Sequence, residues 1–320
     1  MNELGSTRIF FTSDVHGSEV CFSKFLSAAK FYQVDVLILG GDITGKMIVP
    51  LVQESDGTWT GEFQEIPQVA KTVQELELLE KNIRFSGYYP YRTVPAEMEK
   101  LQHDKKLVSE LFSKVMVDGV GRWVALAEER LKGTKVKCYI SPGNDDRFEI
   151  DNILKASSIV LYPEDNVVKI DDDHEMITTA WTNFTPWHSP RETSEEKLAE
   201  MLEAMISKVQ NMENCIFNLH CPPNNTSIDV APELDETMKP VADGGGVNMV
   251  HVGSVAVRSA IEKHQPLLGI HGHIHESRGF AKIGRTICIN PGSEYSEGIL
   301  RGAIINIDEK KVKNYMLTQG

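Results

Sequence analysis

Five apolar stretches of the chain each end at a short turn segment that contains glycine or proline together with polar side chains. Runs of apolar and β-branched residues bounded by turn residues are typical of short buried strands. We therefore expect strands at residues 8–12, 34–39, 135–140, 215–219 and 266–270.

Further regular elements alternate along the rest of the chain. Helical patterns cover residues 148–157, 194–211 and 254–264. Strand patterns cover residues 167–170, 175–181, 286–289, 303–307 and 312–317. Strands and helices mixed throughout the chain, with no internal repeat, predict an α/β protein.

A long segment between two of the predicted strands is expected to be an insertion. About a hundred residues separate Asp42 from Asn144, whereas a crossover between parallel strands needs only a dozen or more. Residues 46–134 are therefore predicted to form an inserted, cap-like segment within a single domain that spans residues 1–320.

The insertion is predicted to begin with a β-hairpin and to be largely helical after it. Ser55-Asp56-Gly57 is a hairpin turn signal between two strand patterns. A helix should follow, then an aromatic loop, then a long helical stretch that begins at a proline and is broken or kinked near residues 118–121. The expected ranges are 47–52 and 58–66 for the strands, 68–84 for the first helix, 85–91 for the loop and 95–133 for the second helix.

Side chains that bind metals follow the five predicted strands. In open α/β sheets, ligands gather at the carboxyl ends of strands. Side chains two residues apart in an extended segment point to one side, so each Asp-x-His or His-x-His pair can bind one metal. Taken singly, such an aspartate is often a helix cap and such a histidine often a core residue, but their conjunction predicts a two-metal hydrolytic site. The predicted ligands are Asp14, His16, Asp42, Asn144, His220, His273 and His275.

The charge balance limits the classes of partner. The chain has 320 residues and a net charge of −13. Non-specific binding to nucleic acids or to anionic membranes depends on clustered Lys and Arg, so both are disfavoured. A small anionic substrate is compatible with this negative net charge, because bound cations would reverse the charge locally. We expect a small phosphorylated substrate, and the oligomeric state stays open.

The cysteines and the amino terminus predict a cytoplasmic protein. Five cysteines, an odd number without a Cys-x-x-Cys pair, argue against a disulfide framework. Residues 1–11 lack a basic start followed by an apolar stretch, and no run of about eighteen apolar residues occurs.

The order of the polar segments resembles the signature of the calcineurin-like metallophosphoesterase superfamily, which is D-x-H, G-D, G-N-H-D/E, a single H and G-H-x-H. Five blocks in order make the resemblance specific, and it covers nearly the whole chain outside the insertion. The blocks here are Asp14-Val15-His16, Gly41-Asp42, Gly143-Asn144-Asp145-Asp146, His220 and Gly272-His273-Ile274-His275.

The resemblance implies a fold and a division of the ligands. The fold would be a four-layer α/β/β/α sandwich of two mixed sheets, with the site at the strand ends. One metal would be bound by Asp14, His16 and His275. The other would be bound by Asn144, His220 and His273, and Asp42 would bridge the two.

One position departs from the signature. The superfamily has a histidine after the asparagine of the third block, where it helps to bind phosphate or to protonate the leaving group. This chain has Asp145 there. It is most similar to the small bacterial and archaeal phosphodiesterases in which that histidine is replaced, and which share a turn like Asn290-Pro291-Gly292-Ser293.

The expected chemistry is hydrolysis of a phosphoester by a hydroxide that bridges two divalent metals. Oxygen and imidazole ligands are compatible with Mn, Fe, Zn or Ni, and affinity order does not choose among these metals. We expect Mn or Fe. Asp42, Asp145 and Asp146 are the candidate catalytic residues; Asp146 either orients a ligand imidazole or caps the following helix. Without an imidazole acid, phosphodiesters and anhydrides with acidic leaving groups should be preferred to alkyl monoesters.

Two alternatives remain, a catalytically inactive binding protein of this fold and a nuclease, the second disfavoured by the acidic charge. Aromatic segments are candidates for a substrate pocket, although such segments more often serve packing. They are Tyr88, Tyr89 and Tyr91, and residues 181–188 together with Arg191.

Overall fold

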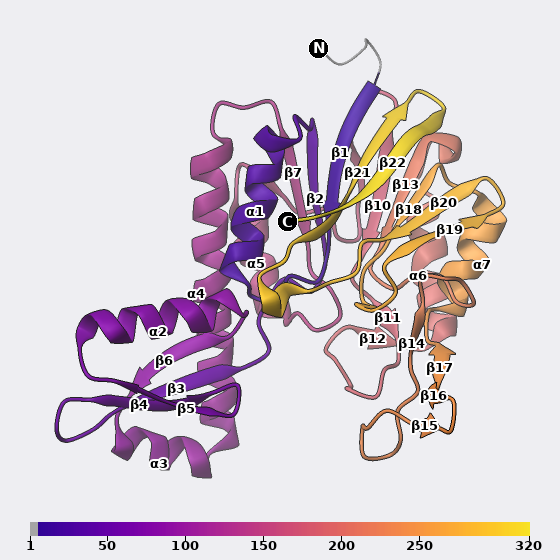
Figure 1. The fold of residues 1–320 in the computed structure, drawn as a ribbon. Coiled ribbons are helices and arrows are strands. Elements are labelled where there is room, and N and C mark those ends of the chain that lie inside the picture. The colour runs from indigo at the N-terminus through magenta and orange to yellow at the C-terminus, as the bar shows by residue number, and fades with distance from the viewer. Residues whose placement is uncertain (1–5) are drawn as a thin grey trace.

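The computed structural model describes residues 6–320, so that the first five residues of the predicted domain lie outside it (Figure 1). Its first sheet has the strand order β22-β21-β1-β2-β7-β8. The four strands from β1 to β8 run parallel, and β21 and β22 add an antiparallel edge. The strands are β1 (Ser6–Thr12), β2 (Val36–Gly40), β7 (Lys137–Ser141), β8 (Val160–Leu161), β21 (Arg301–Asp308) and β22 (Lys311–Gln319).

The second sheet is also mixed, with the order β19-β20-β18-β13-β10-β9. Its four central strands are parallel and its two outer strands antiparallel. Two mixed sheets with helices confirm the predicted α/β class, and the sequence patterns missed only β19 in this sheet. The strands are β9 (Val167–Lys169), β10 (Glu175–Thr179), β13 (Cys215–Leu219), β18 (Leu268–Ile270), β19 (Gly279–Ile283) and β20 (Thr286–Asn290).

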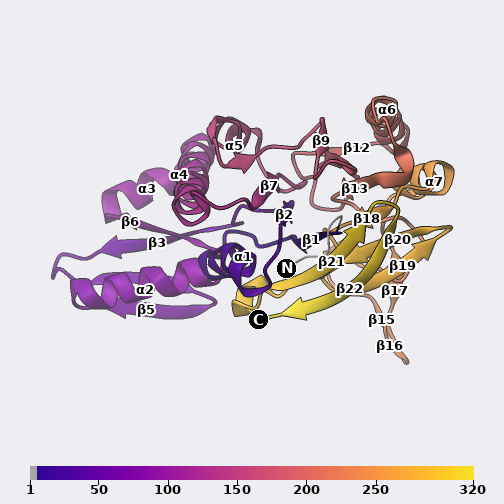
Figure 2. The same cartoon turned by 90° about the horizontal axis from the view of Figure 1, so that it is seen from above.

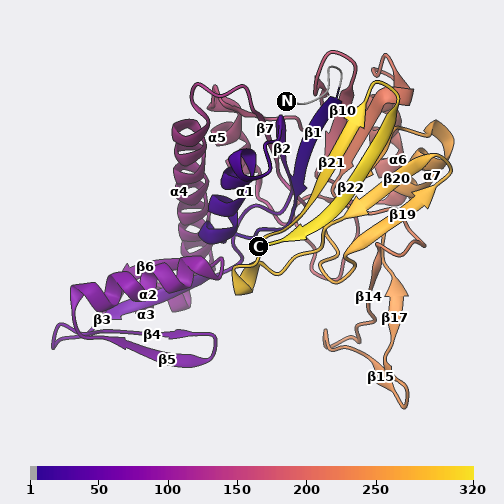
Figure 3. The same cartoon turned by 45° about the horizontal axis from the view of Figure 1, so that its top comes forward.

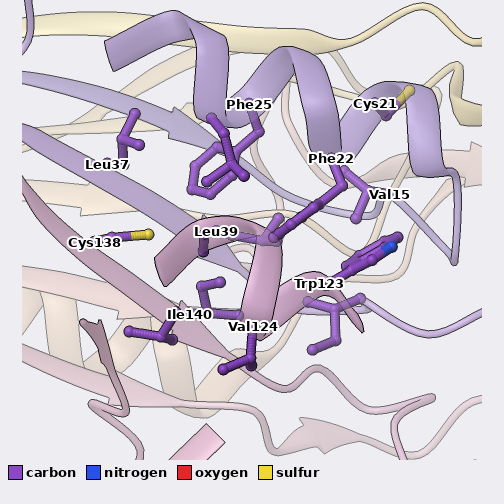
Figure 4. Packing of buried hydrophobic residues seen from close by; sticks show 14 of the residues in the cluster. Val15, Cys21, Phe22, Phe25, Leu37, Leu39, Trp123, Val124, Cys138 and Ile140 are labelled. Carbon is purple, nitrogen blue, oxygen red and sulfur yellow. The ribbon is translucent and has the colours of Figure 1, made fainter. Parts of the chain in front are cut away.

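Three buried clusters hold these layers together. Helices α1 (Glu19–Phe31) and α4 (Lys105–Leu131) cover the outer face of the first sheet, where the rings of Phe22 and Trp123 stack at 4.2 Å (Figure 4). A second cluster, which includes Phe11 and Ile216, fills the space between the sheets. Helices α6 (Glu195–Ile206) and α7 (Val255–His264) cover the second sheet (Figure 2). The layers therefore follow the order helix, sheet, sheet, helix.

The insertion contains a separate lobe that projects from one end of the sandwich (Figure 3). A four-stranded sheet, β5-β4-β3-β6, packs against α2 (Val73–Phe85) through a small core that includes Leu51 and Leu76. Strands β3 and β4 form the predicted hairpin. Most of β5 was expected to be the start of a helix, and β6 begins in the segment expected to be an aromatic loop, so both of these predictions are wrong. The strands are β3 (Ile48–Gln53), β4 (Trp59–Phe63), β5 (Ile66–Ala70) and β6 (Tyr89–Thr93).

The long helical stretch breaks at a different place from the one expected. Helix α3 (Pro95–His103) ends at Asp104, whose carboxylate then accepts hydrogen bonds from the first turn of α4. Helix α4 continues without interruption through Gly119 and Gly121. The second half of α4 packs against α1 in the main core and so supports the sandwich.

Two shorter features extend from the second sheet. Strands β11 (Thr182–Asn183) and β12 (Glu192–Thr193) enclose an aromatic loop, residues 184–190. Residues 230–251 form an arm that carries two small antiparallel pairs (Figure 1). They are β14 (Val230–Pro232) with β17 (Met249–His251), and β15 (Ala242–Asp243) with β16 (Gly246–Val247). Among residues 6–320, no helix has both the length and the apolar character needed to cross a bilayer.

The candidate metal centre

The predicted ligands follow the carboxyl ends of parallel strands in both sheets. Asp14, Asp42 and Asn144 come after β1, β2 and β7, which are neighbours in the first sheet. His220 and His273 come after β13 and β18, which are neighbours in the second. Because parallel strands end at the same edge, the two sheets bring these segments together.

Three of the predicted ligands form one group. Asp14, His16 and His275 offer ligand atoms that all lie within 4.8 Å of one another. The Nε2 atoms of the two imidazoles are 3.1 Å apart, and Nε2 of His275 is 3.5 Å from Oδ1 of Asp14. This group has the composition that the resemblance implied for one metal.

A second group contains Asp42, His220 and His273, again with ligand atoms within 4.8 Å. Oδ1 of Asp42 is 3.5 Å from Nε2 of His220, and its Oδ2 is 3.7 Å from Nε2 of His16 in the first group. The two oxygens of one carboxylate therefore face different groups, as a bridging ligand requires. Asn144 is buried and lines the same cleft as Asp42 and His273.

The buried polar atoms of the centre test whether metal ions fit it. Oδ1 of Asn144, Nδ1 of His16 and Nε2 of His220 are buried and have no hydrogen-bond partner among the described residues. A buried polar atom without a partner costs about 1–3 kcal/mol. The donor set is oxygen and imidazole nitrogen without thiolate, which suits divalent cations. The residues present therefore fit the expected cofactor.

Local contacts orient the ligand side chains. Nδ1 of His220 is bonded to the carbonyl of Gly40 at 3.0 Å, which leaves Nε2 directed at Asp42. The backbone N–H of His273 donates to Asp14 at 3.0 Å. Glycine is required at Gly143, because a Cβ atom there would lie 2.2 Å from Oδ1 of Asp42.

Four of the predicted ligands have left-handed backbone conformations. The φ angles are 57° at Asp14, 38° at His16, 47° at Asp42 and 69° at His273. Non-glycine residues in this region cost on the order of 1 kcal/mol or more each and cluster at functional sites. The left-handed conformation changes the direction in which these side chains leave the backbone at the strand ends. The sequence patterns do not predict it.

Burial and neighbouring charges shift the pKa values of the ligands in different directions. Burial favours neutral His220, but the charge of Asp42 outweighs it and raises the pKa of His220 to about 10. At Asp42 and His273 burial prevails. It raises the pKa of Asp42 to about 6. It lowers the pKa of His273 to about 3, so that this imidazole is neutral near pH 7. Neutral imidazole is the form that binds a metal. Bound cations would in turn favour the ionised form of Asp42.

The role expected for Asp146 is not the one observed. Its carboxylate accepts hydrogen bonds from the backbone N–H groups of Ile43, Thr44 and Gly143. Its bonds thus go to the two ligand loops, neither to an imidazole nor to the helix that follows. The sequence did not predict this role of Asp146, because Ile43 and Thr44 lie about a hundred residues away along the chain.

A cleft of about 1030 Å³ opens from the centre between the aromatic loop and the arm. Phe184, Trp187 and His188 of the segment 181–188 line it, whereas Trp181 is outside the lining and packs against Phe148. The remaining candidates are not part of its lining. Tyr88 packs on Phe63, and Tyr89 accepts a hydrogen bond from Gly45. Tyr91 is hydrogen-bonded to Glu97, and Arg191 pairs with Asp151.

Two polar residues of the cleft were missed from the sequence. Lys46 pairs with Asp145, its Nζ 2.8 Å from Oδ2. Ser189 donates its hydroxyl to the other oxygen of Asp145 at 2.6 Å. Both residues look like ordinary loop residues in the sequence. The one signal in the sequence was the negative charge of Asp145, at the position where the resemblance led us to expect histidine.

The comparisons with sequences give one partial match. No protein-family model matches the chain. An uncharacterised protein of Methanocaldococcus jannaschii is 33% identical over 152 residues, which are 47% of this chain and 61% of that protein. The match therefore spans less than two thirds of that relative.

Solved structures share the fold over almost the full length. One solved chain has a TM-score of 0.59 at 17% identity, covering 98% of this chain and 99% of that one. The protein TT1561 of Thermus thermophilus has a TM-score of 0.52 at 13% identity and covers 98% of both chains. These likenesses show that this chain shares its two-sheet fold with both solved proteins.

Proposed function

We propose that the protein is a metal-dependent phosphoester hydrolase whose main substrates are phosphodiesters. The observation that carries this proposal is the position of Asp42, with one carboxylate oxygen 3.5 Å from His220 and the other 3.7 Å from His16. A carboxylate between two histidine groups is suited to two cations that act on one phosphoryl group.

The predicted ligands would bind two divalent cations. Asp14, His16 and His275 would hold one divalent cation, and Asn144, His220 and His273 the other, with Asp42 shared. Bound there, the cations would supply Lewis-acid chemistry and lower the pKa of a water molecule. The strained loops and the hydrogen bonds of Asp146 keep the ligands in place before substrate arrives.

The replacement of histidine by Asp145 determines the proposed preference. Burial favours the neutral form of Asp145, but the charge of Lys46 outweighs it and holds the pKa of the carboxyl well below its usual range. An ionised carboxylate cannot protonate a leaving group at neutral pH. Diesters and anhydrides with acidic leaving groups should therefore react much faster than alkyl monoesters.

The cleft provides room for the organic part of a small phosphorylated substrate. Its volume of about 1030 Å³ exceeds what a phosphate group needs. Phe184 and Trp187 stand at its side, and Pro232 and Leu234 of the arm also line it. Apolar walls next to a charged centre suit a substrate that joins an organic group to phosphate.

A reconstitution experiment tests the proposed function. Metal-free protein would be loaded separately with Mn²⁺, Fe²⁺, Zn²⁺ and Ni²⁺, and hydrolysis of an aryl phosphodiester and an alkyl phosphomonoester compared. We expect turnover of the diester only with metal, with Mn²⁺ or Fe²⁺ most effective, and loss of turnover with a chelator. Equal rates for the two substrates would contradict the diester preference. No turnover despite two bound metals per chain would favour the inactive binding protein.

A further inference from the structure

Lys46 and Asp145 form an ion pair at the entrance to the metal centre. Nζ of Lys46 is 2.8 Å from Oδ2 of Asp145, and both residues line the cleft together with Asp42 and Asn144. The hydroxyl of Ser189 donates to Oδ1 of Asp145 at 2.6 Å. The carboxylate is therefore held from both sides, and one of its partners is a cation that faces the substrate cleft.

The loop that carries Lys46 is fixed at several points. It starts at Asp42, and its middle residue Thr44 is bonded to Asp146 through both its N–H and its hydroxyl group. The N–H of Gly45 donates to the hydroxyl of Tyr89 at 2.8 Å. The backbone that carries Lys46 is thus set by the same contacts that set the ligand Asp42.

Other cations near the cleft are already engaged. Arg147 donates to Ser109 and Ser113 and lies over the ring of Phe112. Arg191 is buried and pairs with Asp151, outside the cleft lining. The side chain of Lys46 is 46% exposed and shares its ammonium with a single carboxylate. An ammonium has three donors, so this group retains donors for a ligand.

We propose that Lys46 is a catalytic residue that binds the phosphoryl group and stabilises the leaving oxygen, and that Asp145 is a positioning residue that holds it. This inference rests on the proposed function. A fixed cation directed at developing negative charge lowers the barrier without a proton transfer. Water supplies the attacking oxygen, and the P–O bond to the leaving group breaks. The leaving oxygen departs with the bonding electrons and takes its proton from solvent, while Lys46 stays protonated.

The inference explains why the missing histidine need not abolish activity. A lysine supplies positive charge as the protonated imidazole would, but at neutral pH it does not readily give up its proton. Catalysis should therefore respond to the charge of Lys46, and good leaving groups should still be required. Asp145 alone, with its negative charge, would repel a phosphate.

The test uses the full-length, metal-loaded protein with Lys46→Ala, Lys46→Arg and Asp145→Asn. Lys81→Ala, an exposed lysine of α2, is the matched control. Metal content is measured first, because all variants should retain it. The kinetic readout is kcat/KM for a series of aryl phosphodiesters with different leaving-group pKa, and binding of inorganic phosphate is measured by calorimetry.

For Lys46→Ala we expect kcat/KM to fall about 100-fold, as for loss of an oxyanion donor, with a steeper dependence on leaving-group pKa and about tenfold weaker phosphate binding. Lys46→Arg should restore part of the lost kcat/KM and part of the lost phosphate affinity. Asp145→Asn should lower kcat/KM less than Lys46→Ala does. Wild-type phosphate affinity and an unchanged leaving-group slope in Lys46→Ala would overturn the inference. If the wild type hydrolyses no diester, the proposed function fails, whereas the phosphate measurement still decides whether Lys46 binds the anion.

Discussion

Asp146 and Thr44 form two hydrogen bonds. The backbone N–H and the hydroxyl of Thr44 donate to the same carboxylate oxygen of Asp146, at 2.9 and 2.5 Å. The other oxygen accepts from the N–H groups of Ile43 and Gly143. One buried carboxylate thereby joins the loop after β2 to the loop after β7. These loops carry two of the predicted metal ligands, so the geometry of the centre depends on a residue that is not itself a predicted ligand.

Replacement of Asp146 by asparagine should loosen the centre. The amide can place only one acceptor where the carboxylate places two, so it leaves a backbone N–H without its partner. We expect the free energy of unfolding to fall by about 2–3 kcal/mol, and metal affinity to fall about 10–100-fold. Urea unfolding and metal titration measure the two effects. The exposed Asp172→Asn is the control, and equal metal affinity in both variants would refute the role of Asp146.

Asp42→Ala should remove metal and activity together. Both oxygens of this carboxylate face histidine groups, so both predicted metals lose a ligand. Metal content by mass spectrometry should fall well below that of the wild type, while circular dichroism stays that of a folded protein. Asp118→Ala, on the exposed face of α4, should leave both quantities unchanged. Full metal occupancy in Asp42→Ala would show that the residue is not a shared ligand.

The sequence predicts where the candidate metal ligands lie because the pattern that marks each of them is confined to a few neighbouring residues. Each residue lies directly after an apolar strand, and parallel strands of a sheet end at one edge. The fold class follows from the same pattern of alternating elements. A sequence without any structure thus indicates which side chains share an edge, although it does not give the left-handed backbone of Asp14 or His273.

The partners of the two aspartates after Asn144 could not be predicted. Lys46 precedes a hairpin and looks like a surface lysine until β2 and β7 pair and bring its loop to Asp145. The glycines of α4 were also misleading, because glycine is a poor helix former. In the structure, a Cβ atom at Gly119 would be 3.2 Å from the Tyr89 ring, so this glycine provides space for packing.

Two glycine substitutions should have opposite effects on stability. Gly121 lies within α4 and a Cβ atom there meets nothing within 4 Å, so Gly121→Ala should stabilise the protein by about 0.5–1 kcal/mol. At Gly45 a Cβ atom would lie 2.1 Å from the carbonyl oxygen of Gly87, so Gly45→Ala should destabilise it. Chemical unfolding measures both. Destabilisation by Gly121→Ala would mean that the helix is interrupted there, as the sequence pattern suggested.

Trp187→Ala should weaken substrate binding more than turnover. This side chain is 65% exposed on the wall of the cleft, and Glu192 holds its loop by accepting from the N–H groups of Thr185 and Ser189. Loss of an aromatic contact costs about 0.5–1.5 kcal/mol, so KM for an aryl diester should rise about 3–10-fold with kcat little changed. Phe31→Ala, an exposed aromatic on α1, is the control. An unchanged KM would mean that the organic group binds elsewhere.

The His174 imidazole should make stability depend on pH. Its Nδ1 is 2.8 Å from Asp171, and its Nε2 bonds the carbonyl of Asp308 on β21 at 2.9 Å, which links the two sheets. Burial favours the neutral ring, but the bond to Asp171 outweighs it and raises the pKa of His174 above its usual 6.5. The folded state therefore binds the proton more tightly than the unfolded chain, and the resulting stabilisation is complete below the unfolded pKa and is lost as pH rises through the folded pKa.

His174→Gln removes this titration and keeps a side-chain donor. We expect the wild type to exceed the variant in unfolding free energy most at about pH 5.5, and the difference to shrink towards about pH 8.5. Urea unfolding at several pH values measures it, with the exposed His103→Gln as the control. A difference that stays constant over this range would mean that the pair stabilises the fold through its hydrogen bonds alone, because only a shifted proton affinity makes the two curves converge.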